Sequence, residues 1–496
     1  MSSLYSISVK LSALNVSNVW FSCLAFDSTE QHIRHEMISS AKQDTHSTEN
    51  CDHYVYDKRE FHSTIVTEWD IVCDNSWKLP LSQSGLMIGV LLGNLIFGLL
   101  SDRYGRKAPF TIAPVICLIT TIAIAFSPNL IVFTILTALT ALSASGMSQS
   151  AFIIGVELIG DKYRVLCVNF QQVIYSTGTI LLCLTAYYVR QWRDLQFMIA
   201  IPAALLLPLI WLFPESFRWQ LSNGKVDSAL NVLRRAAHWN GIQLNESEFC
   251  DSKILNDSTD FSQKSCDIQT YGPFCMFTNK TVRFWTFSLL FIWVIVSMIY
   301  YGLSFQSQNL GTNTYLTLAA IAAIDIPANI MVTVMLNYFG RKKVLFLLSL
   351  MAGVSCLTAV VIPHDSQLVT LVAILGKCMI SASYTLLYIY TAEIYPTPIR
   401  STSVGVFQTF SRIGGIIAPH LIELSSFGQN MPLIACGLLA LGCCLLAMNL
   451  PETHNRQLPE TFEDTADLRK QQQITITNDC EKSHLIPTDN KNQFYG

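Results

Sequence analysis

Long apolar runs with few charges recur along this chain, and they limit its fold more than any other feature of the sequence. Crossing the hydrocarbon core of a bilayer as an α-helix takes about 20 consecutive apolar residues. Charged residues make up only 14% of the 496 residues, whereas a soluble domain carries about a quarter. The sequence therefore predicts an all-α membrane protein. The apolar runs lie at residues 82–100, 108–126, 130–150, 166–189, 195–213, 284–305, 314–336, 344–362, 368–391, 402–421 and 431–450.

The start of the chain fits this pattern less well. Residues 11–26 form an apolar stretch of 16 residues that includes Asn15 and Asn18, and this is shorter than a membrane span requires. We therefore expect eleven or twelve transmembrane helices, depending on whether residues 1–26 supply a weak or truncated first helix. The expected order after that segment is a loop at 27–79, a helical bundle at 80–213, a linker at 214–283, a second bundle at 284–450 and a tail at 451–496.

The distribution of Lys and Arg predicts which connections face the cytoplasm, because cytoplasmic connections are enriched in these residues. The connections at 127–129, 306–313 and 363–367 contain neither residue. We therefore expect the linker and the C-terminal tail to be cytoplasmic and the first long loop to be extracellular, in the plasma membrane. Arg190 and Arg193, on an outer turn, depart from this pattern. The basic connections contain Arg103, Arg106, Lys107, Lys162, Arg164, Arg341, Lys342 and Lys343.

Cysteine usage and the absence of certain motifs bear on other functions. Cys51 and Cys73 share the first long loop, so an extracellular position would allow a disulfide between them. Most other cysteines lie in the apolar runs, and no Cys/His cluster has the spacing of a metal site. No basic stripe indicates nucleic-acid binding, and no catalytic motif indicates an enzyme. We predict no cofactor, no metal and no nucleic-acid partner.

The sequence also contains an internal duplication. Three patterns of the first half recur after 235 to 237 residues: a glycine beside basic residues, a glutamate seven residues before an arginine, and a Pro-Glu pair. One shared offset for unrelated patterns predicts two similar six-helix bundles joined by the linker. Parallel halves with a substrate site between them are the arrangement of the major facilitator fold. The corresponding residues are Gly105 and Gly340, Glu157 and Glu393, Arg164 and Arg400, and Pro214 and Pro451.

Charged residues gather at the span ends that are predicted to be cytoplasmic. A carboxylate there can lie at a helix N-terminus or bond an arginine of the other bundle. We interpret these residues as a gate that holds the two bundles together in one state and releases them in another. The alternative is that basic residues only fix the topology, and we prefer it for Lys107, Lys342 and Lys343. The candidate gating residues are Asp102, Arg103, Arg106, Glu157, Arg164, Glu393 and Arg400.

These patterns also carry a family likeness. The turn from Gly98 to Lys107 matches the signature of the major facilitator superfamily, and the chain more narrowly resembles the organic cation, organic anion and carnitine carriers. The resemblance implies a twelve-helix carrier with a glycosylated, disulfide-bonded loop after its first helix, and uptake or exchange of charged metabolites. The first long loop departs from this pattern, because it has no glycosylation sequon and few cysteines. The stretches that carry the resemblance are 67–73, 98–107, 214–219, 300–304, 390–396 and 450–453.

Three ionisable residues lie inside apolar runs: Asp325, Lys377 and Arg412. An arginine in the middle of a span costs about 2.5–3.5 kcal/mol on insertion scales, so such residues mark candidate functional sites. We expect Arg412 to face a wet cavity, with an acidic partner or an anionic ligand. The alternative is a structural pair between Arg412 and Asp325 that has no ligand role.

Several tyrosines accompany these charges within the spans. Their rings suit flat or quaternary-ammonium ligands through stacking and cation–π contacts, although a tyrosine in a membrane helix more often fills space. The resemblance implies that these positions line the central cavity, and it places Arg412 where anion and carnitine carriers hold an arginine. Asn329 stands where organic anion carriers have a lysine, which argues against a strongly anionic substrate. The tyrosines are Tyr175, Tyr300, Tyr301, Tyr384 and Tyr388.

Together these features predict a secondary active or facilitative transporter of small organic ions that works by alternating access in a lipid bilayer. We favour organic anions or zwitterions, with carnitine-like compounds leading, and a coupling ion (Na⁺ or H⁺) or a counter-substrate. An organic cation transporter is one alternative. A degenerate, non-transporting membrane protein with a regulatory role is a second, which the weak first helix favours. A sugar or peptide carrier of the same superfamily is a third.

Overall fold

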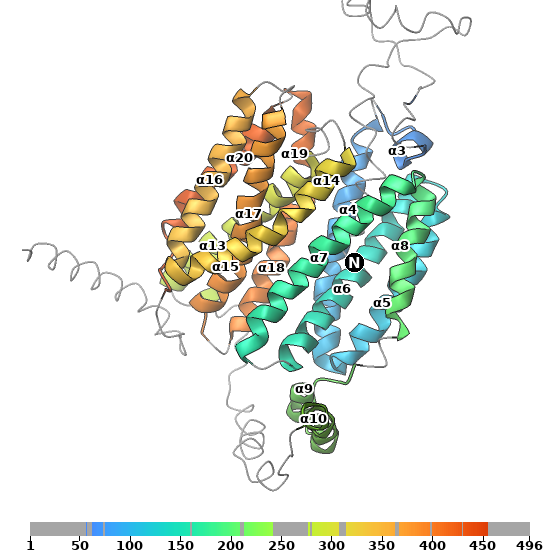
Figure 1. Ribbon diagram of the computed structural model, residues 1–496, viewed down its shortest axis with the longest axis vertical. Helices are drawn as coiled ribbons and strands as arrows, with labels where there is room; N and C mark the ends of the chain where they lie inside the picture. The colour runs from blue at the N-terminus through green and yellow to red at the C-terminus, as the bar shows by residue number, and fades with distance from the viewer. Residues whose placement is uncertain are drawn as a thin grey trace, which may run out of the picture.

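The computed structural model describes residues 56, 62–72, 75–158, 161–208, 213–241, 276–277, 280–306, 314–362, 367–396, 399–428 and 430–454. The predicted first helix at 11–26 and both cysteines of the predicted disulfide, Cys51 and Cys73, lie outside these residues. Two helical bundles stand side by side, with a small pair of helices, α9 (Phe217–Ser222) and α10 (Val226–Asn240), at one end (Figure 1). We call that end the inner end, and the opposite end, which carries α3 (Ile65–Glu68), the outer end.

The first bundle contains a long helix for each apolar run of the first half. α6 packs along both α4 and α5, and α8 covers α5. Gly89 of α4 lies directly against Ala138 of α6, where a Cβ atom would overlap the carbonyl group. A glycine at this position therefore lets the two helices approach closely. The helices of this bundle are α4 (Lys78–Tyr104), α5 (Lys107–Ala125), α6 (Leu130–Leu158), α7 (Asp161–Tyr188) and α8 (Trp192–Leu206).

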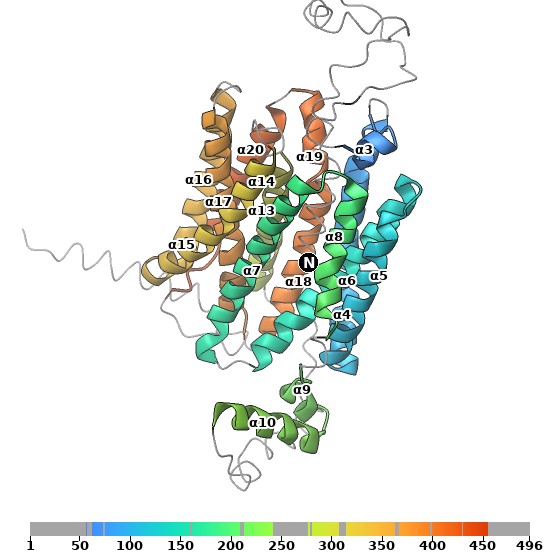
Figure 2. The same cartoon turned by 45° about the vertical axis from the view of Figure 1, so that its right-hand side comes forward.

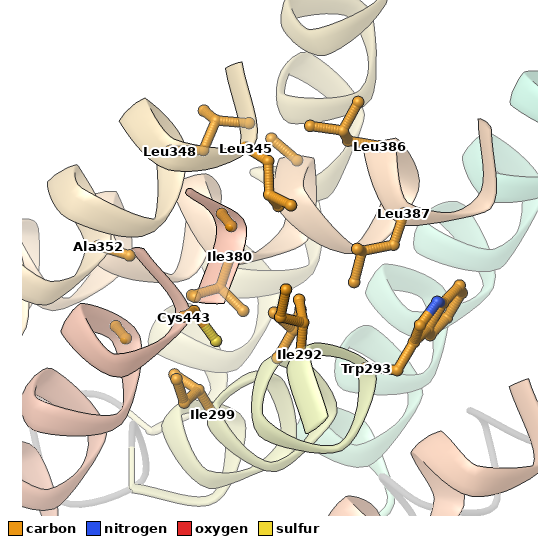
Figure 3. Packing of buried hydrophobic residues seen from close by; sticks show 14 of the residues in the cluster. Ile292, Trp293, Ile299, Leu345, Leu348, Ala352, Ile380, Leu386, Leu387 and Cys443 are labelled. Carbon is orange, nitrogen blue, oxygen red and sulfur yellow. The ribbon is translucent and has the colours of Figure 1, made fainter. Parts of the chain in front are cut away.

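The second bundle is also built of long helices and has its own apolar core. Its helices are α13 (Lys280–Gln306), α14 (Thr314–Ala323), α15 (Asp325–Tyr338), α16 (Arg341–Val361), α17 (Gln367–Ile394), α18 (Arg400–Ile417) and α20 (Met431–Ala447), with the short turns α19 (His420–Glu423) and η7 (Leu424–Ser426). Side chains of α13, α16, α17 and α20 meet in the middle of the bundle and are almost completely buried (Figure 3). They include Ile292, Ile299, Leu345, Leu348, Ile380, Leu387 and Cys443.

Two of the predicted spans are not single helices. The span expected at 314–336 is divided at Ile324 into α14 and α15, and the span expected at 402–421 ends as α18 at Ile417. A proline follows each break. Pro327 and Pro419 lack the amide hydrogen that a continuous helix needs, which explains why the helix is interrupted there. The apolar runs themselves indicate neither break.

Helix polarity differs with position in the fold. Seven helical spans in the described chain, α14 and α15 counting as one, are long and apolar enough to cross a membrane. α7 and α18 do not reach that apolarity, since α7 carries Asn169, Gln171 and Gln172 and α18 carries Gln408 and Arg412. Both helices lie where the bundles meet, α7 against α14 and α18 against α4 (Figures 1 and 2). Polar residues therefore concentrate along the boundary between the bundles.

A glutamate that follows the last long helix of each bundle caps another helix of the same bundle at the inner end. Glu215 Oε1 accepts hydrogen bonds from the amides of Arg106 (2.8 Å) and Lys107 (3.2 Å), where α5 begins. Glu452 Oε1 accepts one from the amide of Arg341 (2.8 Å), where α16 begins. A carboxylate at a helix N-terminus satisfies amides that have no partner within the helix and complements the helix dipole. The internal duplication predicted from the sequence thus recurs in these contacts.

Arg193, which departs from the predicted charge pattern, is paired at the outer end. Its Nη2 lies 2.5 Å from Oε1 of Glu68 in α3 and donates to the carbonyl of Ser127 (2.9 Å). Trp192 donates its indole N–H to the other oxygen of Glu68 (2.7 Å). The carboxylate comes from the loop predicted to be extracellular, so it neutralises the exceptional outer arginine locally.

The bundles contact each other through the outer parts of their helices. The rings of Tyr187 in α7 and Tyr315 in α14 meet edge to face, with centroids 5.7 Å apart. Ser84 Oγ of α4 donates a hydrogen bond to the carbonyl of Ile416 in α18 (2.7 Å). Each of these residues lies within about two turns of the outer end of its helix. These contacts close the outer end of the molecule.

Candidate functional site

Arg412 lies in α18 between the two bundles and is half-buried. Its Nη1 donates a hydrogen bond to the hydroxyl of Tyr301 in α13 (3.0 Å). Its Nε atom is buried and, within the described residues, has no hydrogen-bond partner. A buried donor left in this way costs about 1–3 kcal/mol. The guanidinium therefore keeps one donor that no described residue satisfies.

Asp325 begins α15, where the proline break exposes the start of a helix. The carboxylate is only 5% exposed, and its Oδ2 accepts a hydrogen bond from the hydroxyl of Tyr300 (3.0 Å). The other oxygen, Oδ1, is buried and finds no hydrogen-bond partner in the described part of the chain. A helix N-terminus favours a negative charge, which explains how this carboxylate is tolerated inside the bundle.

Arg412 and Asp325 do not form the ion pair that was the structural alternative. In the described structure each charge instead bonds to its own tyrosine of α13, Tyr301 and Tyr300 respectively. These two rings are neighbours in sequence and stand almost perpendicular, with centroids 5.3 Å apart. The two charges are therefore held apart, and each keeps one buried polar atom unpaired.

The predicted tyrosines come together around these charges. Tyr300 stacks on Tyr384 of α17 (5.7 Å between centroids), and Tyr384 meets Tyr388 edge to face (5.6 Å). Gln408 of α18 donates to the hydroxyl of Tyr388 (2.9 Å). Tyr175 of α7 approaches from the first bundle, within electrostatic range of Tyr300 and Arg412. All of these tyrosines keep partial exposure although they lie between helices, so they provide an aromatic lining.

Lys377 and Asn329 lie behind this lining. Lys377 is 2% exposed, and its Nζ lies 2.7 Å from the centroid of the Tyr300 ring and 3.3 Å from the Tyr300 carbonyl oxygen. Asn329, one turn after Asp325, is 5% exposed and accepts a hydrogen bond from Thr385. Both residues were predicted to face the substrate, and this stays a prediction; in this structure Lys377 contacts Tyr300 and Asn329 contacts Thr385.

Trp293 is a member of the site that was not predicted from the sequence. Its indole is fully buried in α13, packs on Tyr388 (4.9 Å) and Tyr384 (5.5 Å), and donates to Thr391 (3.1 Å). Trp293 lies eight residues before Tyr301 on α13, which places both on one helix face. That spacing was the available signal, but an aromatic residue in an apolar run does not stand out from ordinary core residues.

The candidate gating residues are only partly visible. The side chains of Asp102, Glu157, Arg164 and Arg400 lie outside the described residues, although their backbones belong to α4, α6, α7 and α18. Arg103 is exposed, and Arg106 donates to Ser101 (3.1 Å) within the first bundle.

Glu393 is the candidate gating residue with the most described contacts. It forms a salt bridge with Arg341 (2.9 Å) and accepts a hydrogen bond from Thr453 (2.5 Å). Arg341 also contacts His454. These partners belong to the second bundle or to the segment that directly follows it, so the described contacts do not join the two bundles. A contact between bundles in another state remains a prediction.

The chain as a whole is similar to known transporters. Residues 10–466 match the family described as Sugar (and other) transporter. The chain is 34% identical to the "Organic cation transporter protein" of Drosophila melanogaster, over 88% of this chain and 80% of that protein. It is 33% identical to "Solute carrier family 22 member 21" of Mus musculus (86% and 75%). It is also 33% identical to "Organic cation/carnitine transporter 2" of Rattus norvegicus (84% and 74%).

Solved structures share the same fold. The partially occluded, inward open conformation of the xylose transporter XylE from E. coli superposes with a TM-score of 0.62 at 15% identity, covering 92% of this chain and 97% of that one. The proton:xylose symporter XylE bound to 6-bromo-6-deoxy-D-glucose gives a TM-score of 0.60 at 17% identity, covering 92% and 98%. The major facilitator fold predicted from the internal duplication is therefore confirmed.

Proposed function

This chain belongs to solute carrier family 22 within the sugar (and other) transporters, and from that premise we propose that it carries organic anions or zwitterions, with carnitine-like compounds the leading candidates. It is a multi-pass membrane transporter of small organic substrates and not an enzyme.

The unpaired Nε of Arg412 is the observation that carries the proposal. A guanidinium presents its N–H donors in a planar fork that matches a carboxylate, and it stays charged at physiological pH. Tyr301 occupies Nη1 and leaves Nε without a partner in the described structure. A ligand carboxylate would satisfy that donor and offset part of the cost of burying the charge.

Asp325 favours a zwitterion over a simple anion. Its unpaired Oδ1 lies in the same aromatic surroundings as the arginine, because Tyr300 and Tyr301 are in contact. A substrate with a carboxylate and a cationic group could place one charge near each residue, with tyrosine faces around the cationic part. The same carboxylate also supports the second candidate function, transport of organic cations, and one relative is named as a carrier of that class.

We further propose that transport occurs across the plasma membrane by rocking of the two bundles about this site. The C-terminus and the linker would then be cytoplasmic, and the inner end of the molecule would face the cytosol. Closure of the outer end by Tyr187, Tyr315 and Ser84 suits a state open toward the inside. A coupling ion (Na⁺ or H⁺) or a counter-substrate would supply the driving force for net uptake.

An uptake panel distinguishes these substrate classes. Cells that express the full chain are given radiolabelled carnitine, p-aminohippurate or tetraethylammonium, with Arg235→Gln on the exposed face of α10 as the control variant. We expect uptake of carnitine above that of p-aminohippurate, and a loss of at least about tenfold in carnitine uptake for Arg412→Gln. Uptake of tetraethylammonium alone, unchanged in Arg412→Gln, would instead establish the cation transporter. Surface-expressed protein that transports none of the three would favour the regulatory alternative.

A further inference from the structure

Four residues form a chain of polar contacts across the closed outer end. Ser84 belongs to α4 of the first bundle, whereas Ile416, His420 and Glu423 belong to the second. Ser84 Oγ lies 2.7 Å from the carbonyl oxygen of Ile416 and 3.2 Å from Nε2 of His420. The other ring nitrogen of His420, Nδ1, lies 3.2 Å from Oε2 of Glu423. We call this set the outer latch, because it joins the bundles where they must separate to open outward.

The donors and acceptors of the outer latch can be assigned from chemistry. Ile416 lies in the last turn of α18, where carbonyls lack partners within the helix, so its oxygen accepts the single hydrogen of the Ser84 hydroxyl. Ser84 Oγ can then only accept from His420, which requires a hydrogen on Nε2. An ionised Glu423 carboxylate likewise only accepts, which requires a hydrogen on Nδ1.

A neutral imidazole carries one N–H, so it can satisfy only one of these two contacts. The imidazolium satisfies both and adds a charge pair with Glu423. We propose that His420 is a proton-binding site at the outer face, and that its protonation tightens the outer latch and favours the state that is closed to the outside. This goes beyond the proposed substrate, because the ligand is a proton and the site lies at the outer end.

The surroundings of His420 make Glu423 its charged partner. The elements that pack on α19 are α13, α20 and η7, and in the described structure α20, η7 and the outer part of α13 carry no Asp, Glu, Lys, Arg or His. On α4, Lys78 lies six residues before Ser84, and on α18, Arg412 lies eight residues before His420. His420 and Glu423 keep 42% and 44% exposure of their side chains, so protons from the outer solution reach them.

The direction of the effect follows from linkage. A proton that is bound more tightly in the closed state shifts the equilibrium toward that state as the outer pH falls. An ion pair with this much exposure is modest in strength, so we expect the equilibrium between the closed and open outer end to shift by about two- to fivefold.

A buried residue beside the outer latch reports the opening. Met87 lies one turn inward from Ser84 and is 2% exposed, so a cysteine in its place can react with a membrane-impermeant thiosulfonate only when the outer end opens. We would measure this reaction on intact cells that express the full chain with Met87→Cys, at an external pH of about 7.5 and about 5.5. Protein without the new cysteine gives the background from native thiols.

The decisive quantity is a ratio of two rates of reaction with the thiosulfonate, measured at the same pH. The rate for the protein with Met87→Cys and His420→Gln is divided by the rate for the protein with Met87→Cys alone. This ratio cancels the pH dependence of the thiol itself. We expect a ratio near unity at the higher pH that rises two- to fivefold at the lower pH, and no rise when Glu423→Gln is also present in both proteins. His238→Gln, on the exposed end of α10, is the matched control. When it replaces His420→Gln in the ratio, the ratio should be the same at both pH values. A ratio that is the same at both pH values, or a rise that persists with Glu423→Gln, would overturn the proposal. The readout is conformational, so it stands apart from the uptake test of function.

Discussion

Tyr300 bonds to Asp325 and Tyr301 bonds to Arg412. The loss in stability when each hydroxyl is removed should therefore differ. Asp325 is nearly inaccessible at 5% exposure and depends on Tyr300, whereas Arg412 is half-buried and can also reach water. An unpaired buried group costs more when no water can replace the lost partner. The two tyrosines are adjacent on α13, so they make a matched pair for substitution.

We predict that Tyr300→Phe destabilises the protein more than Tyr301→Phe does, by about 1–3 kcal/mol. The thermal midpoint of the purified protein in detergent, together with surface expression, measures the difference. Tyr301→Phe should instead retain stability and alter the affinity for carboxylate substrates. Equal midpoints for the two variants would mean that Asp325 does not depend on Tyr300.

At this scale, the residue types that make up the site could be predicted from the sequence, but the side of each helix that faces the site could not. Asp325, Arg412 and the five tyrosines were predicted from their types within apolar runs, and the structure brings them together. Lys377 was also predicted to face the substrate; in this structure it lies against Tyr300 and is 2% exposed, so contact with a substrate stays a prediction. Which side of a helix faces the site depends on contacts between helices, and these contacts are not encoded in the local sequence pattern.

At the scale of elements, the contacts and breaks at helix ends were the features that the sequence predicted least well. Glu215 and Glu452 each hold the first amides of a helix that is distant in sequence, at the start of α5 and α16. The Pro-Glu pairs are recognisable in the sequence as repeats, but their contacts with these helix ends were not predicted. Pro327 and Pro419 were visible too, yet the apolar runs continued through both and the breaks were not predicted. Hydropathy measures suitability for the membrane and is insensitive to interruptions of the helix.

We predict that Glu452→Ala destabilises the second bundle by about 1–2 kcal/mol, and that Glu452→Gln has a smaller effect because the amide oxygen still accepts while the charge is lost. Glu215→Ala and Glu215→Gln should follow the same order in the first bundle. Asp227→Asn, exposed on α10, is the control. Thermal midpoints of the purified variants provide the measurement, and an equal loss for Ala and Gln would show that charge alone matters.

Two similar bundles with one closed end define the molecule at the largest scale. Membrane topology is the part of this description that rests on sequence alone, since charge distribution predicts the inner end to be cytoplasmic. Arg193, one of the two arginines that depart from this prediction, pairs with Glu68, and Arg190 departs from it as well. Whether residues 11–26 span the membrane determines the side on which the N-terminus lies.

If that stretch of 16 residues, which is shorter than a span requires, does not cross the bilayer, we predict that an epitope tag at residue 2 is stained on intact cells. A tag at the C-terminus should be stained only after permeabilisation and serves as the internal control. Staining of both tags only after permeabilisation would demonstrate a twelfth helix.

The binding of a substrate carboxylate by Arg412 is tested most directly by a ligand pair that differs only in that group. Inhibition constants for a carboxylate substrate and its neutral carboxamide are measured against labelled uptake, in the wild-type protein and in Arg412→Lys. We predict that the wild-type protein prefers the carboxylate by at least about tenfold, and that Arg412→Lys loses most of this preference because lysine keeps the charge but lacks the planar fork. An equal preference for the carboxylate in both proteins would contradict binding at Arg412.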